Sequence, residues 1–162
     1  MNKAKRNFWL DIVLLVLFIV IVASLPGHHT AGWATVHAIA GTLMILGSLV
    51  HVAWHWPWLK ANFLRYPRNP GRVVRANRRI DIPLLVLFIP CGVSGLLVWL
   101  MDLTSATYII LLREGWSHLH HLTGLLILLL MLLHSGRHLK WLVCMARKCF
   151  APGKQMKLTL DR

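Results

Sequence analysis

The chain has 162 residues, of which 57% are hydrophobic, and its 18 Lys and Arg residues against five acidic ones give a formal net charge of +13. A basic excess is typical of nucleic-acid-binding proteins, but in those proteins the charges are interleaved with an ordinary apolar fraction. Here the charged and apolar residues form separate blocks, which argues against nucleic acid as a partner and leaves too little polar chain for a soluble enzyme domain.

Four long apolar blocks follow one another along the chain: Phe8–Leu25, Ala31–Trp58, Ile80–Met101 and Trp116–Val143. A helix of about 18 apolar residues is long enough to cross roughly 30 Å of hydrocarbon. The first block is longer than the core of a signal peptide, and no clear small-residue cleavage site follows it. We therefore predict an all-α membrane protein, a single membrane domain over residues 1–162 with four spans.

The basic residues predict the orientation of these spans. Apart from Arg113, they lie near the N-terminus, in the connection at about 60–79, or from the end of the fourth block onwards. Basic connections stay on the cytoplasmic side, where they contact lipid headgroups. We expect both termini to be cytoplasmic and the protein to be a multi-pass component of the inner (cytoplasmic) membrane.

The sequence contains an internal repeat. The segment "DIVLLVLFI" from Asp11 recurs as "DIPLLVLFI" from Asp81, and "GWATVHAIAGTLMILGSLVHVAWHWPWL" from Gly32 aligns with "GWSHLHHLTGLLILLLMLLHSGRHLKWL" from Gly115. In this alignment every histidine of the second span meets a histidine of the fourth. The pattern predicts a four-helix bundle made of two tandem two-helix repeats, about 7–60 and 80–143, separated by a cytoplasmic connection at about 60–79 and followed by a tail at 144–162.

The matched histidines have a spacing that indicates cofactor binding. His37 and His51 are 14 residues apart, as are His120 and His134. Fourteen residues advance a helix by roughly 21 Å and return to nearly the same face. Each span then presents two imidazoles at two depths, an outer layer (His37 and His120) and an inner layer (His51 and His134).

Each facing pair of imidazoles can ligate a planar metal cofactor, and haem, with its axial imidazoles and apolar macrocycle, suits an apolar bundle. Gly41 and Gly124 follow the outer histidines by one turn, where a missing side chain lets a porphyrin approach the backbone. The alternative is that these are buried histidines hydrogen-bonded between helices.

This arrangement resembles the di-haem b-type cytochromes, namely respiratory cytochrome b subunits and ferric-reductase-type transmembrane domains. The compact four-span form, from about Phe8 to Val143, also resembles a bacterial family of small membrane cytochromes described as a domain of unknown function. The resemblance implies two non-covalent haem b groups that relay electrons across the membrane. It implies an outer haem whose iron is held by His37 and His120, and an inner haem whose iron is held by His51 and His134. The chain lacks the flavin, nicotinamide or iron–sulfur segment of larger relatives, so we expect an electron-transfer subunit of an oxidoreductase complex with partner redox subunits.

The remaining histidines have several interpretations. His55 and His138 follow the inner layer by one turn, and they could act as cations at helix ends, contact a haem propionate beside Arg137 and Lys140, or replace the inner ligands. Four others crowd the outer end, as solvated loop residues, proton acceptors from a quinol, or a surface metal site: His28, His29, His118 and His121.

Three further features lie within the spans. Asp11 and Asp81 open the first and third spans, where we expect them to cap the helix N-termini, with a proton relay as the alternative. Pro90 should kink the third span, and Cys91 is expected to be a small apolar filler.

The function that these patterns favour is transmembrane electron transfer by a di-haem subunit that exchanges electrons with quinone or quinol and with a partner subunit. A haem-free, histidine-lined metal or proton transporter is the alternative, but it would need polar residues between the two layers, where the sequence has mainly Leu, Ile and Met. A passive membrane anchor for an enzyme complex would leave the matched histidines unexplained.

Overall fold

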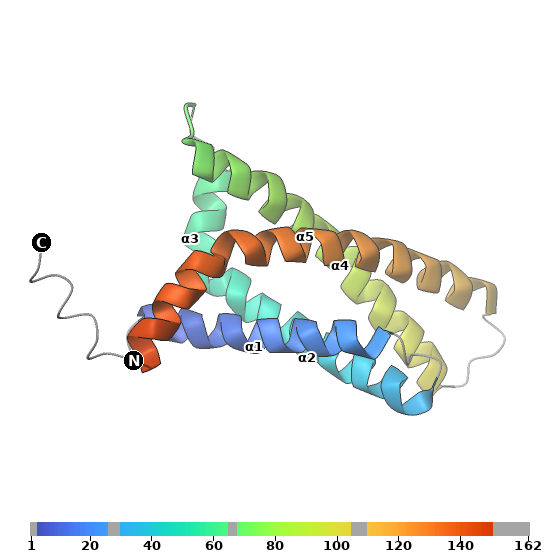
Figure 1. The fold of residues 1–162 in the computed structure, drawn as a ribbon. Coiled ribbons are helices and arrows are strands. Elements are labelled where there is room, and N and C mark those ends of the chain that lie inside the picture. Colours follow the sequence, from blue (N-terminus) through green and yellow to red (C-terminus); the bar gives the residue numbers. More distant parts are fainter. Residues whose placement is uncertain (1–2, 26–29, 65–67, 105–109, 151–162) are drawn as a thin grey trace, which may run out of the picture.

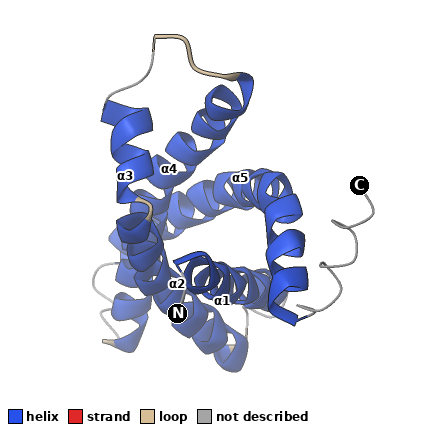
Figure 2. Cartoon of the chain, turned by 90° about the vertical axis from the view of Figure 1, so that its left-hand side faces the viewer, coloured by secondary structure: helices blue, strands red, loops and turns tan. Residues whose placement is uncertain are grey.

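The computed structural model describes residues 3–25, 30–64, 68–104 and 110–150, and the regular structure in these segments is helical throughout (Figures 1 and 2). Its elements are four long helices, a short helix and a turn of π-helix: α1 (Lys3–Ser24), α2 (Ala31–Trp54), α3 (Trp56–Leu59), η2 (Lys60–Leu64), α4 (Arg72–Leu103) and α5 (Ile110–Phe150).

The four long helices are each long and apolar enough to cross a membrane, which confirms the four predicted spans. Their apolar side chains mostly face outward. Among the described residues, the buried apolar side chains are only Phe8, Ala40, Met44 and Met145. An apolar exterior with backbone groups bonded inside helices is what a lipid environment requires. The chain is therefore an all-α, multi-pass membrane protein.

The helices pack as two antiparallel pairs. α1 packs mainly against α2 and α4 mainly against α5, while contacts between α2 and α4 join the pairs. Close approach depends on glycine: a Cβ at Gly47 would lie 2.8 Å from Leu14 of α1, and one at Gly92 would lie 3.2 Å from Ile45 of α2. By contrast, no Cα of α2 comes within 8 Å of a Cα of α5 in the described residues.

The start of α1 and the end of α5 lie at the same end of the molecule (Figure 1). The rings of Trp9 and Phe150 meet there edge to face, with centroids 5.9 Å apart. Figure 2 shows that α5 bends, so that its last part turns away from the direction of the rest of the helix.

Three helices extend beyond the predicted apolar blocks. α1 begins at Lys3 rather than Phe8, α4 begins at Arg72 rather than near Ile80, and α5 covers Ile110–Phe150 rather than Trp116–Val143. Arg and Lys are good helix formers, and basic residues in a last turn, here Arg147 and Lys148, interact favourably with the helix dipole. Parts of the predicted connection and tail are therefore helical extensions of spans.

The early start of α1 and α4 overturns one prediction. Because these helices begin at Lys3 and Arg72, Asp11 and Asp81 lie more than two turns inside them and cannot cap their N-termini. A separate expectation is a kink at Pro90. α4 is one continuous helix from Arg72 to Leu103 that includes Pro83 and Pro90.

Candidate cofactor site

The outer layer brings together the two histidines that the repeat predicted. The rings of His37 on α2 and His120 on α5 have centroids 6.0 Å apart and are nearly perpendicular, at 89°. Two imidazoles that bind one metal ion from opposite sides have centroids about 6 Å apart, because each metal–nitrogen bond is about 2.0–2.1 Å long. The separation of the outer rings therefore fits a shared metal centre.

Hydrogen-bond partners define the protonation state of the outer rings. Ser24 is fully buried and donates its only hydroxyl proton to the Ile21 carbonyl at 2.6 Å. The Ser24 Oγ, 3.0 Å from His37 Nδ1, must then accept a proton from that nitrogen. His120 Nδ1 likewise donates to the Cys91 carbonyl at 3.0 Å. Both rings carry their proton on Nδ1 and the lone pair on Nε2, which is the state that ligates a metal.

Cys91 is therefore more than the apolar filler that we expected. Its carbonyl accepts from His120 Nδ1 and also from the hydroxyl of Ser94 at 3.1 Å, and its Sγ lies 3.7 Å from the same His120 nitrogen. Ser94 is fully buried, and its single hydroxyl proton is shared between this carbonyl and the nearer Pro90 carbonyl at 2.6 Å. The backbone of α4 thus fixes the orientation of the His120 ring.

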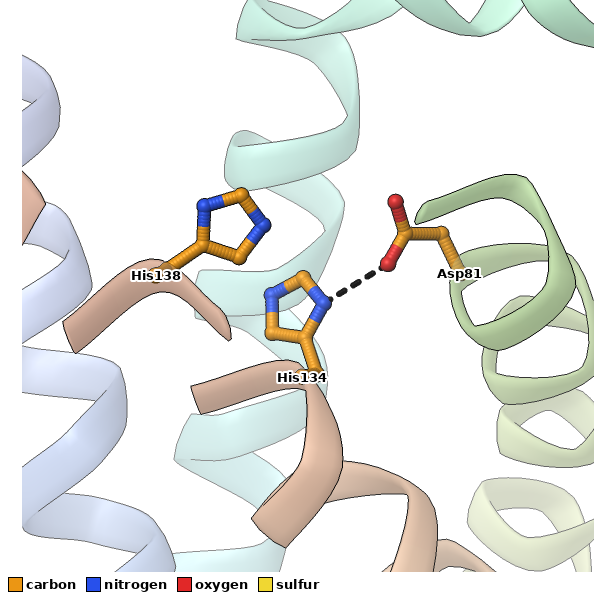
Figure 3. A group of neighbouring side chains, drawn as sticks. All are labelled: Asp81, His134 and His138. Carbon is orange, nitrogen blue, oxygen red and sulfur yellow. Dashed lines mark hydrogen bonds and ion pairs between the residues drawn. The ribbon is translucent and has the colours of Figure 1, made fainter. Parts of the chain in front are cut away.

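The inner layer places each histidine against a carboxylate. His134 Nδ1 donates to Asp81 Oδ1 at 2.8 Å (Figure 3), and His51 Nδ1 lies 3.0 Å from Asp11 Oδ1. The angles of the second pair do not satisfy a hydrogen bond, so it is a close contact between the two side chains. The hydrogen bond to Asp81 assigns the proton of His134 to Nδ1 and its lone pair to Nε2, and the Asp11 carboxylate favours the same tautomer of His51.

A second histidine stands beside each inner one. The ring of His55 lies 4.6 Å from that of His51, and the ring of His138 lies 4.7 Å from that of His134. Burial lowers the pKa of His55, and the neighbouring His51 lowers it further, which weighs against a cation there although His55 is the C-cap of α2. The helix-end interpretation does not apply to His138, because α5 continues to Phe150.

Two arginines lie at the same end of the molecule as the inner layer. Arg137, next to His138 in the chain, is exposed and donates from Nε to Asn77 Oδ1 at 2.8 Å. The Arg6 guanidinium lies 4.2 Å above the ring of Trp54 on α2. Both guanidinium groups can offer charge to an anionic substituent such as a propionate.

The glycines divide into two kinds. A Cβ at Gly41 would meet nothing within 4 Å, and one at Gly124 would meet only the Cys91 Sγ at 4.0 Å. A Cβ at Gly95, in contrast, would lie 2.7 Å from Cε1 of His120. Gly95 is thus required by close packing, whereas Gly41 and Gly124 leave space beside the outer histidines, as a planar ligand would need.

The other residues predicted for the site are exposed on α5 or lie outside the described residues. His118 and His121 are exposed at the outer end, and the ring of His121 lies 6.2 Å from that of His120. Lys140 is exposed on α5. His28 and His29 lie outside the described residues.

One group of side chains could hold a metal ion without haem. The candidate ligand atoms of Asp81, His134 and His138 all lie within 4.8 Å of one another (Figure 3), and no other such set occurs in the described segments. Two imidazoles and one carboxylate suit a divalent transition metal.

Sequence reasoning missed the groups that hold the imidazoles. The sequence predicts helix caps at Asp11 and Asp81, with a proton relay as the alternative, and it contains no signal for the role of Ser24. A signal for the two acids was present, because they are two of only five in the chain and occupy matched positions of the repeat. The Cys91 carbonyl left no signal, because a backbone acceptor does not depend on side-chain identity.

Comparisons with protein-family models, with curated proteins and with solved structures find no match for this chain. Its function must therefore be argued from the site.

Proposed function

We propose that this chain is a di-haem b-type cytochrome subunit that carries electrons across a membrane. One observation carries the proposal: His37 and His120 approach to 6.0 Å between two helices that do not pack on each other, with open space at Gly41 and Gly124. Helices that pack directly lie about 8–10 Å apart, axis to axis, and leave no room for a planar cofactor. The His37 and His120 rings approach each other across a wider gap between α2 and α5, as the two axial ligands of one haem would.

Four histidines would hold the two haems. His37 and His120 are the proposed ligands of the outer haem, and His51 and His134 those of the inner haem. In each case Nδ1 faces an acceptor, from Ser24, the Cys91 carbonyl, Asp11 or Asp81. Such partners orient metal-bound imidazoles and raise their basicity. Bound haem iron would supply reversible one-electron chemistry, and Arg137 and Arg6 would face the propionates of the inner haem.

The matched contacts also support a two-repeat architecture. Asp11 with His51 and Asp81 with His134 are the same pair in the two copies, and Ser24 and Ser94 are matched serines that are both fully buried. Because the start of α1 and the end of α5 lie at the same, basic end of the molecule, we propose cytoplasmic termini and an inner-membrane location.

The exposed residues at the two ends of the bundle suggest which partners the protein binds. The exposed His118 and His121 lie at the outer end, where they can exchange protons with a quinone or quinol. The basic inner end offers a surface for lipid headgroups and for an acidic face of another subunit. We therefore propose quinone as the small-molecule partner and a complex with other redox subunits.

A haem-free metal site is the second candidate, favoured by the close set of Asp81, His134 and His138. A metal or proton path through the bundle has less support. The hydroxyls of Thr42 and Thr123, which lie between the two layers, are both bonded to carbonyls of their own helices, at 2.8 Å and 2.6 Å. They offer little to a permeating ion.

The proposal is tested by transmembrane electron transfer. The purified protein is reconstituted in sealed vesicles that contain ferricyanide, and dithionite is added outside. We expect fast reduction of the trapped ferricyanide by the wild type and by His118→Ala, and loss of the reaction in both His37→Ala and His51→Ala. Transfer that survives in either of these two variants would contradict a path through both haems. A colourless protein that binds one divalent metal ion and is inactive in this assay would favour the second candidate.

A further inference from the structure

The two histidine layers differ in the charge of the groups that face Nδ1. In the inner layer both partners are carboxylates, Asp11 at 3.0 Å from His51 and Asp81 at 2.8 Å from His134. In the outer layer both partners are neutral: the Ser24 hydroxyl oxygen faces His37 and the Cys91 carbonyl faces His120, each at 3.0 Å. The difference concerns both members of each layer, so it distinguishes one end of the molecule from the other.

The two carboxylates lie where their charge has a large effect. Asp11 and Asp81 are inside the apolar helices α1 and α4, and their side chains are only 22% and 18% exposed. Charges at such positions in a membrane protein are costly, and they persist where a partner or a function offsets the cost. In these surroundings of low dielectric constant, the field of a carboxylate at an imidazole is much stronger than it would be in water.

A carboxylate that accepts the Nδ1 proton, as Asp81 does from His134, makes the imidazole a more electron-rich ligand. Asp11 makes no hydrogen bond with His51 and acts on this ring through its charge, 3.0 Å away. An electron-rich axial ligand favours the oxidised, more positively charged iron, so it lowers the reduction potential. Hydrogen bonding to the axial ligand is one of the ways in which a protein sets the potential of a haem. A hydroxyl oxygen or a carbonyl exerts the same influence more weakly, because neither carries a net charge.

We propose that Asp11 and Asp81 act as positioning residues that give the inner haem a lower reduction potential than the outer haem. This inference rests on the proposed function and deepens it, because it assigns a direction. One electron shared by the two haems would rest at the outer one, with the outer iron reduced and the inner iron oxidised. The favoured direction of transfer is then from the basic inner end to the outer end.

The test is a redox titration of the purified protein, followed by visible absorption. We expect two midpoints in the wild type. Asp11→Asn and Asp81→Asn should each raise the lower midpoint by about 59 mV or more, which corresponds to a tenfold change in the equilibrium constant, and should leave the upper one unchanged. The control is Asp102→Asn, because Asp102 is exposed and pairs with Arg113 away from the histidines; it should change neither.

A second measurement does not depend on the Asn variants retaining haem. His37→Ala should contain the inner haem alone and titrate at the lower midpoint, and His51→Ala should contain the outer haem alone and titrate at the upper one. The reverse order, or Asn variants that keep both haems at unchanged midpoints, would overturn the inference while the di-haem function stands. A wild-type protein without haem would overturn the proposed function itself.

Discussion

The ring centroids of His37 and His120 lie 6.0 Å apart, with the rings nearly perpendicular, although no Cα of α2 lies within 8 Å of a Cα of α5 in the described residues. Each ring is held from behind by an acceptor on the helix that packs against its own, Ser24 of α1 or the Cys91 carbonyl of α4. The neighbouring helix of each pair thus orients the imidazole toward the opposite pair. This arrangement leads to separate expectations for the ligands, for the groups that support them and for the space around them.

Removing an outer histidine ligand should release the outer haem and leave the inner haem bound. His37→Ala or His120→Ala should reduce the haem content from about two to about one per chain, because each variant removes one axial ligand of the same haem. His121→Ala is the matched control, since its exposed ring lies beside His120 and should be dispensable. Haem content is measured as the pyridine haemochrome. Loss of both haems from a protein that remains helical would mean that the layers are not independent.

The inner ligands should be the histidines that face carboxylates. His51→Ala and His134→Ala should each remove the inner haem. His55→Ala and His138→Ala should retain it with a shifted spectrum, because each removes only a tilted neighbouring ring, whose centroid lies 4.6 Å from that of His51 or 4.7 Å from that of His134. Low-temperature visible spectra of the four variants make the comparison. If His55→Ala and His138→Ala lose the inner haem and His51→Ala and His134→Ala keep it, the inner ligands are His55 and His138, one helical turn later in the sequence.

Gly95 should be required for the position of His120. A Cβ at Gly95 would lie 2.7 Å from Cε1 and 2.9 Å from Nδ1 of that ring, so Gly95→Ala must displace the ring from the Cys91 carbonyl. We expect haem affinity at the outer site to fall about 10–100-fold, as when a supporting hydrogen bond is lost. Gly92→Ala is the control, because its Cβ would meet only the flexible end of Ile45 at 3.2 Å. Equal haem affinity in both variants, measured by haem titration of the haem-free protein, would contradict this role.

Gly41 and Gly124 should tolerate a side chain in the haem-free protein but not in the protein with haem. Gly41→Leu and Gly124→Leu fill the space beside the outer histidines, so the outer haem should be lost. The haem-free protein should be no less stable, because Leu is about 1 kcal/mol better than Gly in a helix. Gly136→Leu, at another open position, should keep both haems. Thermal unfolding and haem content together make the test, and two haems in Gly41→Leu would show that no porphyrin lies beside that residue.

The sequence was sufficient to predict the four long helices, because each is marked by a continuous run of apolar residues. Each span is a long apolar run, and the matched positions of His37 and His120 were enough to predict that the two rings meet. The ends of α4 and α5 were predicted less well, because helices continue into basic segments that are not apolar but form helix readily.

The groups that support the histidines could not be predicted in the same way. Whether Asp81 caps a helix or faces His134 depends on where α4 begins and on its rotation against α5. Both are properties of the packed bundle, and the apolar pattern leaves them open. The repeat nevertheless contained the relevant information, because Asp11 and His51 are matched by Asp81 and His134.

The central claim, that the four matched histidines hold two haems, is tested most directly by the haem content of the purified wild-type protein. The pyridine haemochrome should give about two haem b groups per chain, and the untreated reduced protein should show the sharp α-band of low-spin, bis-imidazole iron. One haem per chain would contradict the assignment of one layer. A folded, helical protein that binds no haem after expression with ample haem supply would contradict the account as a whole.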